Sequence, residues 1–236
     1  GIEANTGSLG MGISKGKGML FAKRYQGRKG KVIVLTGDGE FQEGQNFEAL
    51  QSAAQQGFHE LIVIMDHNKL QSDRLVTRIV DLGNLESKIR SFGWHVMRCD
   101  GHDYSQLTHV FSEFERILDQ PKFLIADTVK GQGISFMEHP KALETGAGFY
   151  KWHAGAPADE AFFHGQEELL SGILTSFRAL GLGDVQIRTE ERESIASFKS
   201  EKEFLVTAYG QALTQYARKN SGFVVLDGDL SYDCGL

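Results

Sequence analysis

Hydrophobic residues gather in short continuous runs, separated by stretches in which apolar positions recur at helical spacing. Lys31–Thr36 (KVIVLT) lies between two glycines and Leu61–Met65 (LIVIM) is uniformly apolar, which is typical of strands buried on both faces of a parallel sheet. The apolar residues between the two runs are Phe47, Leu50, Ala53, Ala54 and Phe58. Their spacing predicts a helix that joins two buried strands.

The alternation continues along the next seventy residues. We expect a helix over Val80–Phe92, a strand over Trp94–Cys99, a helix over Tyr104–Leu118 and a strand over Phe123–Val129. Strands that alternate with helices predict an α/β fold, a doubly wound parallel sheet with helices on both faces. Ligands of such sheets bind beyond the carboxyl ends of the strands, so functional residues are expected in the loops that follow them.

A long segment without periodicity, Lys130–Asp159, breaks this pattern. It carries five glycines and ends near the sequence WHAGAP. Loops of this length in compact domains are usually functional or disordered, and the neighbouring Trp152 and His153 argue against plain disorder. We therefore expect a functional loop.

The remaining pattern predicts the domain organisation. Residues 160–180 read as a helix, 184–202 as a charged linker, and 203–218 and Phe223–Leu226 as the first helix and strand of a second α/β domain. That helix and strand bury too little apolar surface to fold alone, and the opening residues GIEANTGSLGMG read as a loop already in progress. We expect an internal piece of a longer protein: an N-terminally incomplete domain over 1–183, a linker over 184–202 and a truncated domain over 203–236.

Composition excludes several classes of function. The 236 residues include 25 Lys and Arg against 31 Asp and Glu, a formal net charge of −6, so no broad basic surface for nucleic acid or membrane lipid is expected. No apolar run approaches the roughly 18 residues of a transmembrane span. The two distant cysteines, Cys99 and Cys234, cannot form a disulfide framework, which favours a reducing cytoplasm.

Two familiar motifs are present only in part. Gly37-Asp38-Gly39 follows a predicted strand, but a dinucleotide-binding G-x-G-x-x-G motif would need glycine where Gln42 stands. Gly12–Gly16 has the spacing of a nucleophile elbow around Ser14, yet no strand precedes it. The sequence therefore favours neither a dinucleotide site nor a serine hydrolase.

Asp38 and Asn68 form a stronger pair, because each follows a predicted buried strand. A carboxylate, an amide oxygen and a main-chain carbonyl, completed by phosphate oxygens and water, suit octahedral Mg²⁺. Gly37 and Gly39 would let the backbone approach a diphosphate, and a helix beginning near Phe41 would point its N-terminus at that anion. The alternative interpretation is a turn aspartate and a turn asparagine without a ligand.

The motifs around these two residues resemble those of transketolases, which use thiamine diphosphate. GDG followed by Asn68 is similar to the cofactor signature of that family, TGSLGMGIS to its TGPLGQGI loop, and GDGEFQEGQNFEAL to its GDG-x-x-x-EG-x-x-x-E run. DHNKL resembles its metal segment, and TVKGQGISFME with WHAGAP the stretch that ends in its active-site histidine. EFLVTAYGQALTQYARKNSGFVVLDGDLS resembles the start of its pyrimidine-binding domain, so the resemblance covers essentially the whole chain.

The resemblance implies a set of cofactor-binding residues. Asp38 and Asn68 would ligate Mg²⁺ through their side chains and Leu70 through its carbonyl. His153 would contact the diphosphate and the reacting oxygens of the substrate, although a solvent-exposed loop histidine is the alternative. The residues expected to line the diphosphate and the thiazolium ring of the cofactor are Gly7, Leu9, Gly10, Gly37, Gly39 and Glu40.

The resemblance also implies a homodimer whose active sites lie between subunits. Glu43 and Glu48 would share protons across the interface, and Asp229 would reach the cofactor of the opposite subunit. Glu43 lies four residues before Phe47, in the apolar stripe, so we expect it to be partly buried and to need a partner or a proton. Glu48 as a solvated glutamate and Asp229 as a turn residue are the alternatives.

Three other residues receive structural interpretations. His102 is expected to brace a helix start together with Asp103. His67 is expected to face away from the metal if Asn68 faces it. Cys99 is expected in the core.

Departures from the family pattern bear on the substrate. Val206 and Asp233 stand where the resemblance places an arginine and a serine that hold the phosphate of the donor. An apolar group and a carboxylate cannot replace those contacts, which favours a substrate that is not phosphorylated or is bound differently. The glutamate that activates the aminopyrimidine would lie beyond Leu236, and the N-terminal histidines of the family would precede Gly1.

The expected activity is transfer of a two-carbon ketol unit from a ketose donor to an aldehyde acceptor by a thiamine diphosphate and Mg²⁺ enzyme. One alternative is a 2-oxo acid decarboxylating relative of the deoxyxylulose phosphate synthase type, although the position of Glu43 and the sequence LDGDLS favour transketolase. The other is a cofactor-binding homologue or subunit without activity of its own. Small sugars are the expected substrates.

Overall fold

The structure, a computed structural model, describes residues 3–5, 7–183, 185–188, 205–220 and 222. The contacts divide the chain into two compact units, residues 1–185 and 186–236. The described part of the second unit contains helix α8 (Leu205–Lys219), close to the helix predicted over 203–218. The predicted strand Phe223–Leu226 and most of the predicted linker lie outside the described residues.

A four-stranded parallel sheet forms the centre of the first unit. Its strands are β1 (Val32–Gly37), β2 (Leu61–His67), β5 (His95–Asp100) and β6 (Lys122–Asp127), in the spatial order β1-β2-β6-β5. All three pairings are parallel, as predicted. The carboxyl ends of the strands therefore meet along one edge of the sheet. The predicted burial of β1 on both faces is wrong for the single chain, because β1 is an edge strand on which Ile33 is 57% and Leu35 72% exposed.

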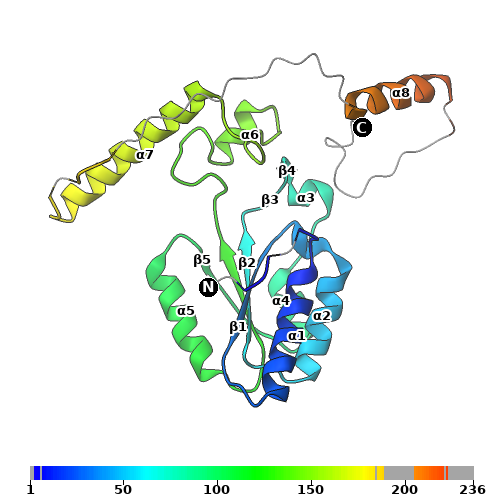
Figure 1. The fold of residues 1–236 in the computed structure, drawn as a ribbon, viewed down its shortest axis with the longest axis vertical. Helices are drawn as coiled ribbons and strands as arrows, with labels where there is room; N and C mark the ends of the chain where they lie inside the picture. The colour runs from blue at the N-terminus through cyan, green and yellow to red at the C-terminus, as the bar shows by residue number, and fades with distance from the viewer. Residues whose placement is uncertain (1–2, 6, 184, 189–204, 221, 223–236) are drawn as a thin grey trace. The chain divides into compact units, whose positions relative to one another are not determined.

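Helices cover both faces of this sheet, which confirms the predicted α/β class. Helices α1 (Met11–Tyr25), α2 (Gly44–Gln55) and α4 (Leu85–Ser91) lie on one face, and α5 (Tyr104–Arg116) lies on the other (Figure 1). The larger core cluster includes Leu50, Val63 and Phe123 on the first face. The second cluster joins Cys99 to Phe114 and Leu124 beneath α5, so Cys99 is a core residue as expected.

Helix α1 packs unusually close to β1 because glycines occupy its sheet-facing side. A Cβ atom on Gly16 would lie 2.7 Å from Cγ2 of Val34, and one on Gly12 would lie 3.0 Å from Cγ1 of the same residue. The sequence pattern did not predict this helix, because glycines occupy positions on its buried side where large apolar residues normally mark a helix. The close approach fixes the position of the loop that precedes α1.

The helix predicted over Val80–Phe92 is shorter in the structure. Helix α4 begins only at Leu85, because Gly83 adopts a left-handed conformation (φ 63°) and the Asn84 side chain caps the helix by accepting from Ser87 N at 2.9 Å. The preceding residues form short elements that the pattern missed: β3 (Leu70–Gln71), β4 (Arg74–Leu75) and α3 (Val76–Ile79).

The aperiodic segment that follows β6 is folded against the rest of the first unit. It contains the short helix α6 (Lys141–Thr145) and is followed by α7 (Asp159–Ala179), which matches the helix predicted over 160–180. Ala142, Leu143 and Tyr150 form a third buried cluster with Leu70. No helix in the described part of the chain has the length and apolar character needed to cross a bilayer.

Candidate functional site

Asp38 and Asn68 lie next to each other along the edge where the strands end. Strands β1 and β2 pair in register, with Gly37 opposite Asp66, and the main-chain N–H of Asp38 donates to the Asp66 carbonyl at 3.2 Å. Asn68 follows β2 by one residue. The topology therefore brings the two predicted metal-binding residues to the same edge.

The Asp38 carboxylate is buried and held by main-chain amides. Only 1% of the residue is exposed. Its Oδ1 accepts from Gly39 N at 2.8 Å and its Oδ2 from Lys69 N at 2.6 Å. Burial raises the pKa of Asp38 despite these hydrogen bonds, and none of the lysine, arginine or histidine side chains in the described ranges forms an ion pair with it.

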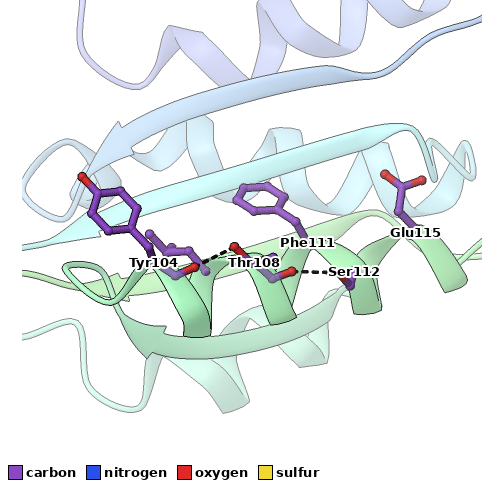
Figure 2. A pocket seen from close by; sticks show the side chains of 6 residues that line it. Tyr104, Thr108, Phe111, Ser112 and Glu115 are labelled. Atoms are coloured by element: carbon purple, nitrogen blue, oxygen red, sulfur yellow. Dashed lines mark hydrogen bonds between the residues drawn. The ribbon is translucent and has the colours of Figure 1, made fainter. Parts of the chain in front are cut away.

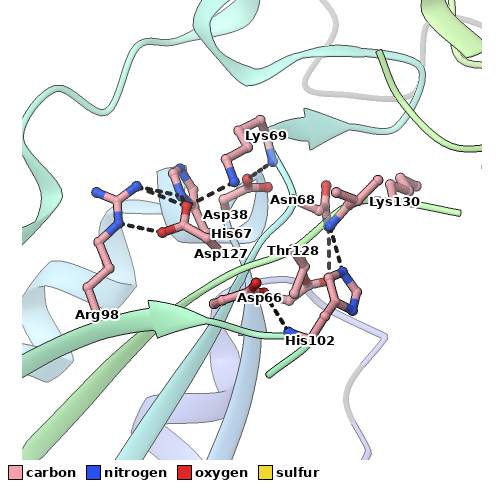
Figure 3. Close-up of polar contacts among 12 residues, drawn as sticks. Asp38, Asp66, His67, Asn68, Lys69, Arg98, His102, Asp127, Thr128 and Lys130 are labelled. Atoms are coloured by element: carbon pink, nitrogen blue, oxygen red, sulfur yellow. Dashed lines mark hydrogen bonds and ion pairs between the residues drawn. The ribbon is translucent and has the colours of Figure 1, made fainter. Parts of the chain in front are cut away.

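Asn68, Lys69 and Leu70 form a tight loop against this carboxylate (Figure 3). The Asn68 side chain donates from Nδ2 to Asp66 Oδ2 at 2.9 Å, and its Oδ1 accepts from Leu70 N at 3.0 Å. Lys69 has a left-handed backbone, with φ 67°. Asp66 is itself fixed by the hydroxyl of Thr128, which follows β6. Asp38 thus contacts the residue that separates Asn68 from Leu70.

This arrangement fits a hard divalent cation. A buried carboxylate without a cationic partner is costly in its ionised form, and a metal ion beside it would offset that cost. The amide oxygen of Asn68 and a main-chain carbonyl are further hard donors. No group of three or more His, Cys, Asp or Glu side chains suited to a metal occurs among the described residues, so the expected site depends on an amide, a carbonyl and the ligand itself.

Glu40 connects two of the glycine-containing segments predicted to line the diphosphate. Its Oε1 accepts from Gly10 N at 2.8 Å and its Oε2 from Gly37 N at 3.2 Å. Gly10 has φ 79°, and a Cβ atom there would lie 2.6 Å from Cβ of Glu43, so the position requires glycine. The structure therefore holds the loop before α1 against the end of β1.

The other predicted cofactor-lining residues lie around this contact. Leu9 is 45% exposed, and its carbonyl accepts from Gln45 Nε2 at 2.7 Å. Gly7 is exposed. A Cβ atom on Gly39 would lie 2.9 Å from Cγ of Gln71, so glycine allows β3 to pack closely here. The 3₁₀ helix η1 (Glu40–Gln42) follows, and α2 begins only at Gly44 rather than near Phe41 as predicted.

His153 lies on the exposed surface of the long segment, within reach of Lys130. The Lys130 Nζ atom is 2.9 Å from His153 Nδ1, and it lies 5.4 Å from the centre of the Tyr150 ring. Burial lowers the pKa of Lys130, while the negative charges of Asp38 and Asp66 act in the opposite direction. These charge interactions place Lys130 in the electrostatic environment of the predicted metal site. Lys130 belongs to the segment TVKGQGISFME that resembles the family, but no role was predicted for it.

Glu43 does not occupy the position expected from the apolar stripe. It is exposed and adopts an extended conformation (φ −61°, ψ 126°) as the N-cap residue of α2. The helix starts one residue later, so Glu43 does not share the face of Phe47, and the predicted partial burial is wrong for the single chain. Glu48 is also exposed. Asp229 lies outside the described residues.

An ionic cluster that sequence reasoning did not predict surrounds Asp127, the last residue of β6. The carboxylate accepts from Arg98 at 2.6 and 2.9 Å and lies 2.9 Å from Lys69 Nζ and 3.0 Å from His67 Nδ1. Burial acts to raise the pKa of Asp127, but these donors together hold it far below its usual value. The His67 side chain thus contacts Asp127, while its charge also acts on Asp38.

His102 plays a different structural part from the one predicted. Asp103 caps α5 by accepting from Ser105 N at 2.8 Å and Gln106 N at 3.1 Å. His102 instead accepts at Nε2 from Val129 N at 2.9 Å, which ties the loop after β5 to the chain after β6. The predicted brace is therefore provided by Asp103 alone.

Two shallow hollows lie against α5. One is lined by Leu107, Phe111 and Glu115 together with Tyr104, Thr108 and Ser112 (Figure 2). The hydroxyls of Thr108 and Ser112 donate to carbonyls of their own helix at 2.7 and 2.9 Å. These polar groups are already satisfied, and neither hollow contains a residue of the predicted cofactor site.

Residues 1–148 match the family described as the thiamine diphosphate binding domain of transketolase. This chain belongs to the transketolase family. It is 34% identical over 173 residues to one of the subunits of the apulose-4-phosphate transketolase of Phocaeicola vulgatus, covering 73% of this chain and 58% of the relative. It is 38% identical over 138 residues to the 6-deoxy-6-sulfo-D-fructose transketolase subunit SqwG of Clostridium sp., covering 58% of this chain and 50% of the relative. The transketolase-family chain thus matches 58% of the length of the first relative and 50% of the length of the second.

The fold agrees with that of a solved transketolase. The structure of the Campylobacter jejuni enzyme superposes with a TM-score of 0.55 at 23% identity, covering 77% of this chain and 32% of that one. At this level of identity the likeness concerns the fold. It confirms the parallel α/β architecture of the transketolase-family chain described above.

Proposed function

We propose that this chain supplies the metal- and diphosphate-binding part of a thiamine diphosphate-dependent transferase. The reaction moves a two-carbon ketol unit from a ketose donor to an aldehyde acceptor. The observation that carries the proposal is the buried Asp38 carboxylate, which lies against the loop formed by Asn68 and Leu70 and forms no ion pair with a lysine, arginine or histidine of the described residues. Membership of the transketolase family supports the choice of cofactor.

Each predicted residue then has a definite task. Asp38 and Asn68 would hold Mg²⁺ through their side chains and Leu70 through its carbonyl, and the ion would bind the cofactor's diphosphate. Main-chain groups near Gly10, Gly37 and Gly39, positioned by Glu40, would line the same anion. When bound, thiamine diphosphate supplies the nucleophilic carbon and the electron sink that the bond cleavage needs.

His153 would contact the diphosphate and the oxygens of the reacting sugar. Its Nδ1 is held by Lys130, so the imidazole would act on a substrate oxygen through Nε2. The segment that carries His153 is anchored through Tyr150, whose N–H donates to the Asp73 carbonyl at 2.7 Å. This anchoring would hold the imidazole near the edge of the sheet.

A second copy of the chain would complete the active site. Glu43 and Glu48 are exposed and so are accessible to a partner, with which they would share protons, and Asp229 would reach the cofactor of the opposite subunit. We propose a homodimer. Two of the relatives are named as transketolase subunits, so assembly with a different chain is the outcome that would replace this proposal.

The substrate proposed is a ketose that is not phosphorylated, or whose phosphate is bound differently from the family pattern. Val206, which stands in place of the expected arginine, lies in α8 and is 41% exposed. Asp233 lies outside the described residues. One relative is named for a sugar phosphate and another for a sulfonated sugar, so the family accommodates both kinds of anion.

Calorimetry with the complete protein tests the cofactor site. Thiamine diphosphate should bind only when Mg²⁺ is present, and Asp38→Asn should weaken that binding by at least 100-fold. A matched control is Asp119→Asn, an exposed aspartate before β6. Cofactor binding that does not depend on Mg²⁺, or that survives Asp38→Asn, would overturn the proposed site.

Substrate assays then separate the possible activities. Ketol transfer from a ketose supports the proposal, whereas carbon dioxide release from pyruvate would support the decarboxylating alternative. Cofactor binding without turnover of any donor would indicate a binding subunit. Equal turnover of phosphorylated and free ketoses would contradict the proposed substrate class.

A further inference from the structure

Asp127 holds both sequence neighbours of Asn68. Its Oδ1 lies 3.0 Å from His67 Nδ1 and 2.9 Å from Lys69 Nζ. Asn68 stands between these two residues, and its own side chain contacts Asp66 and the Leu70 amide instead. One carboxylate on β6 therefore fixes the chain on either side of a predicted metal ligand on β2 (Figure 3).

Arg98 fixes the carboxylate itself. From β5 it donates Nε to Asp127 Oδ2 at 2.6 Å and Nη2 to Oδ1 at 2.9 Å, a two-point contact that restricts the orientation of the group. Strand β6 lies between β2 and β5 in the sheet. The cluster thus links three adjacent strands, and the Asp127 side chain is 30% exposed.

Lys69 requires such support because its backbone is strained. A φ of 67° is unfavourable for a residue with a side chain, and such conformations persist where the surroundings enforce them. Two contacts act on this residue: its N–H donates to Asp38 Oδ2 at 2.6 Å, and its side chain pairs with Asp127 at 2.9 Å. The conformation of Lys69 determines where Asn68 and Leu70 point.

We propose that Asp127 is a positioning residue for the metal loop. By holding Lys69 and His67, it keeps Asn68 Oδ1 and the Leu70 carbonyl at the spacing that a divalent cation requires, without touching the ion. This inference rests on the proposed function, because the loop is a metal loop only if the chain binds Mg²⁺ with thiamine diphosphate. Residues that orient metal ligands in this way typically alter metal affinity by 10- to 100-fold when replaced.

The test is a Mg²⁺ titration of the complete protein at saturating thiamine diphosphate, followed by calorimetry. Asp127→Asn preserves shape but removes the charge and should weaken Mg²⁺ binding about 10- to 100-fold. Asp127→Glu keeps the charge and should restore part of the affinity. The matched control is Glu115→Gln on α5, which removes an exposed ion pair between Glu115 and Lys31 and should leave the Mg²⁺ affinity unchanged.

Replacements of Lys69 test how the carboxylate acts. Lys69→Ala and Lys69→Gly both lose the ion pair. The left-handed backbone conformation at this position is unfavourable for alanine but not for glycine. Lys69→Gly should therefore bind Mg²⁺ more tightly than Lys69→Ala. If Asp127→Asn does not fold, these two variants still test whether the contact between Asp127 and Lys69 positions the metal loop.

The outcomes distinguish the two proposals. A wild-type protein that binds no thiamine diphosphate with Mg²⁺ would remove the proposed function and this inference together. If the wild-type protein binds both, and the Mg²⁺ affinity of Asp127→Asn lies within twofold of the wild-type affinity, only the proposed role of Asp127 would be overturned. Equal Mg²⁺ affinity of Lys69→Ala and the wild-type protein would do the same.

Discussion

Lys130 Nζ lies 2.9 Å from His153 Nδ1, so the first residue of the long segment after β6 contacts the predicted catalytic histidine near its end. A lysine ammonium can only donate, and Nδ1 must therefore accept. The neutral imidazole then carries its proton on Nε2, where it can be donated to a substrate or diphosphate oxygen. Lys130 also brings positive charge toward Asp38 and Asp66.

Replacing Lys130 should affect catalysis through this histidine. We expect Lys130→Met to lower kcat for ketol transfer about 10-fold or more, because the tautomer of His153 is no longer fixed. Lys130→Arg keeps a donor and should lose less. The measurement is steady-state kinetics of the complete protein at saturating cofactor, with His153→Ala as the reference. Full activity of Lys130→Met beside an inactive His153→Ala would contradict this role.

Glu40 should stabilise the fold as well as the site. Glu40→Ala leaves the partly buried amides of Gly10 and Gly37 without their acceptor, which should lower the free energy of unfolding by about 1–3 kcal/mol. Glu40→Gln keeps one acceptor oxygen and should lose less. Urea denaturation measures both variants, and an equal loss in the two would show that the amide contacts do not matter.

The close packing of α1 on β1 gives a paired test on one helix. Gly16→Ala places a methyl group 2.7 Å from Cγ2 of Val34 and should destabilise the protein by about 1–3 kcal/mol. Gly18→Ala meets nothing within 4 Å and should stabilise the helix by about 0.5–1 kcal/mol. Thermal unfolding of the two variants should shift in opposite directions. Shifts of the same sign would contradict the packing described for α1.

Lys122 should make stability depend on pH in the alkaline range. The residue is 2% exposed, and its ammonium donates to the His59 carbonyl. Burial lowers its pKa, with the nearby charge of Lys31 acting in the same direction. The unfolded chain therefore holds this proton more strongly, and the free energy of unfolding should rise as pH increases from the lowered pKa toward about 10.4.

Denaturation at several alkaline pH values, compared between variants, measures this effect. Lys122→Met should lose the rise seen in the wild-type protein. Lys29→Met, at an exposed position outside the sheet, should keep it. A rise that persists in Lys122→Met would assign the effect to another group.

The sequence pattern predicted most of the sheet because β2 and β6 are largely buried on both faces and therefore almost uniformly apolar, whereas β1 is just as apolar although one of its faces is exposed. It placed Asp38 and Asn68 at one edge for the same reason, since parallel strands end together. It missed α1, where Gly12 and Gly16 replace the apolar side chains that normally mark a helix. It extended α4 too far, since apolar Val80 and Leu82 precede the Asn84 cap.

The polar contacts of the site were less accessible to sequence reasoning. Asp127, Arg98 and Lys69 come from three strands or their ends, and no fixed spacing along the chain relates them. The burial expected of Glu43 depended on a helix start that was wrong by a single turn. Family motifs identify which residues approach a cofactor, whereas the supporting ion pairs depend on the order of strands in the sheet.

Leu70 couples two parts of the site. Its carbonyl belongs to the predicted metal loop, while its side chain is buried beside Tyr150, three residues before His153. Local opening of the segment that carries His153 and release of the Mg²⁺ ion should therefore be linked equilibria. Binding of the ion orders Leu70, and an ordered Leu70 lowers the entropy cost of ordering the histidine segment. Amide hydrogen exchange at Tyr150 should slow when Mg²⁺ and thiamine diphosphate are added. The packing contact between Leu70 and Tyr150 would transmit this effect.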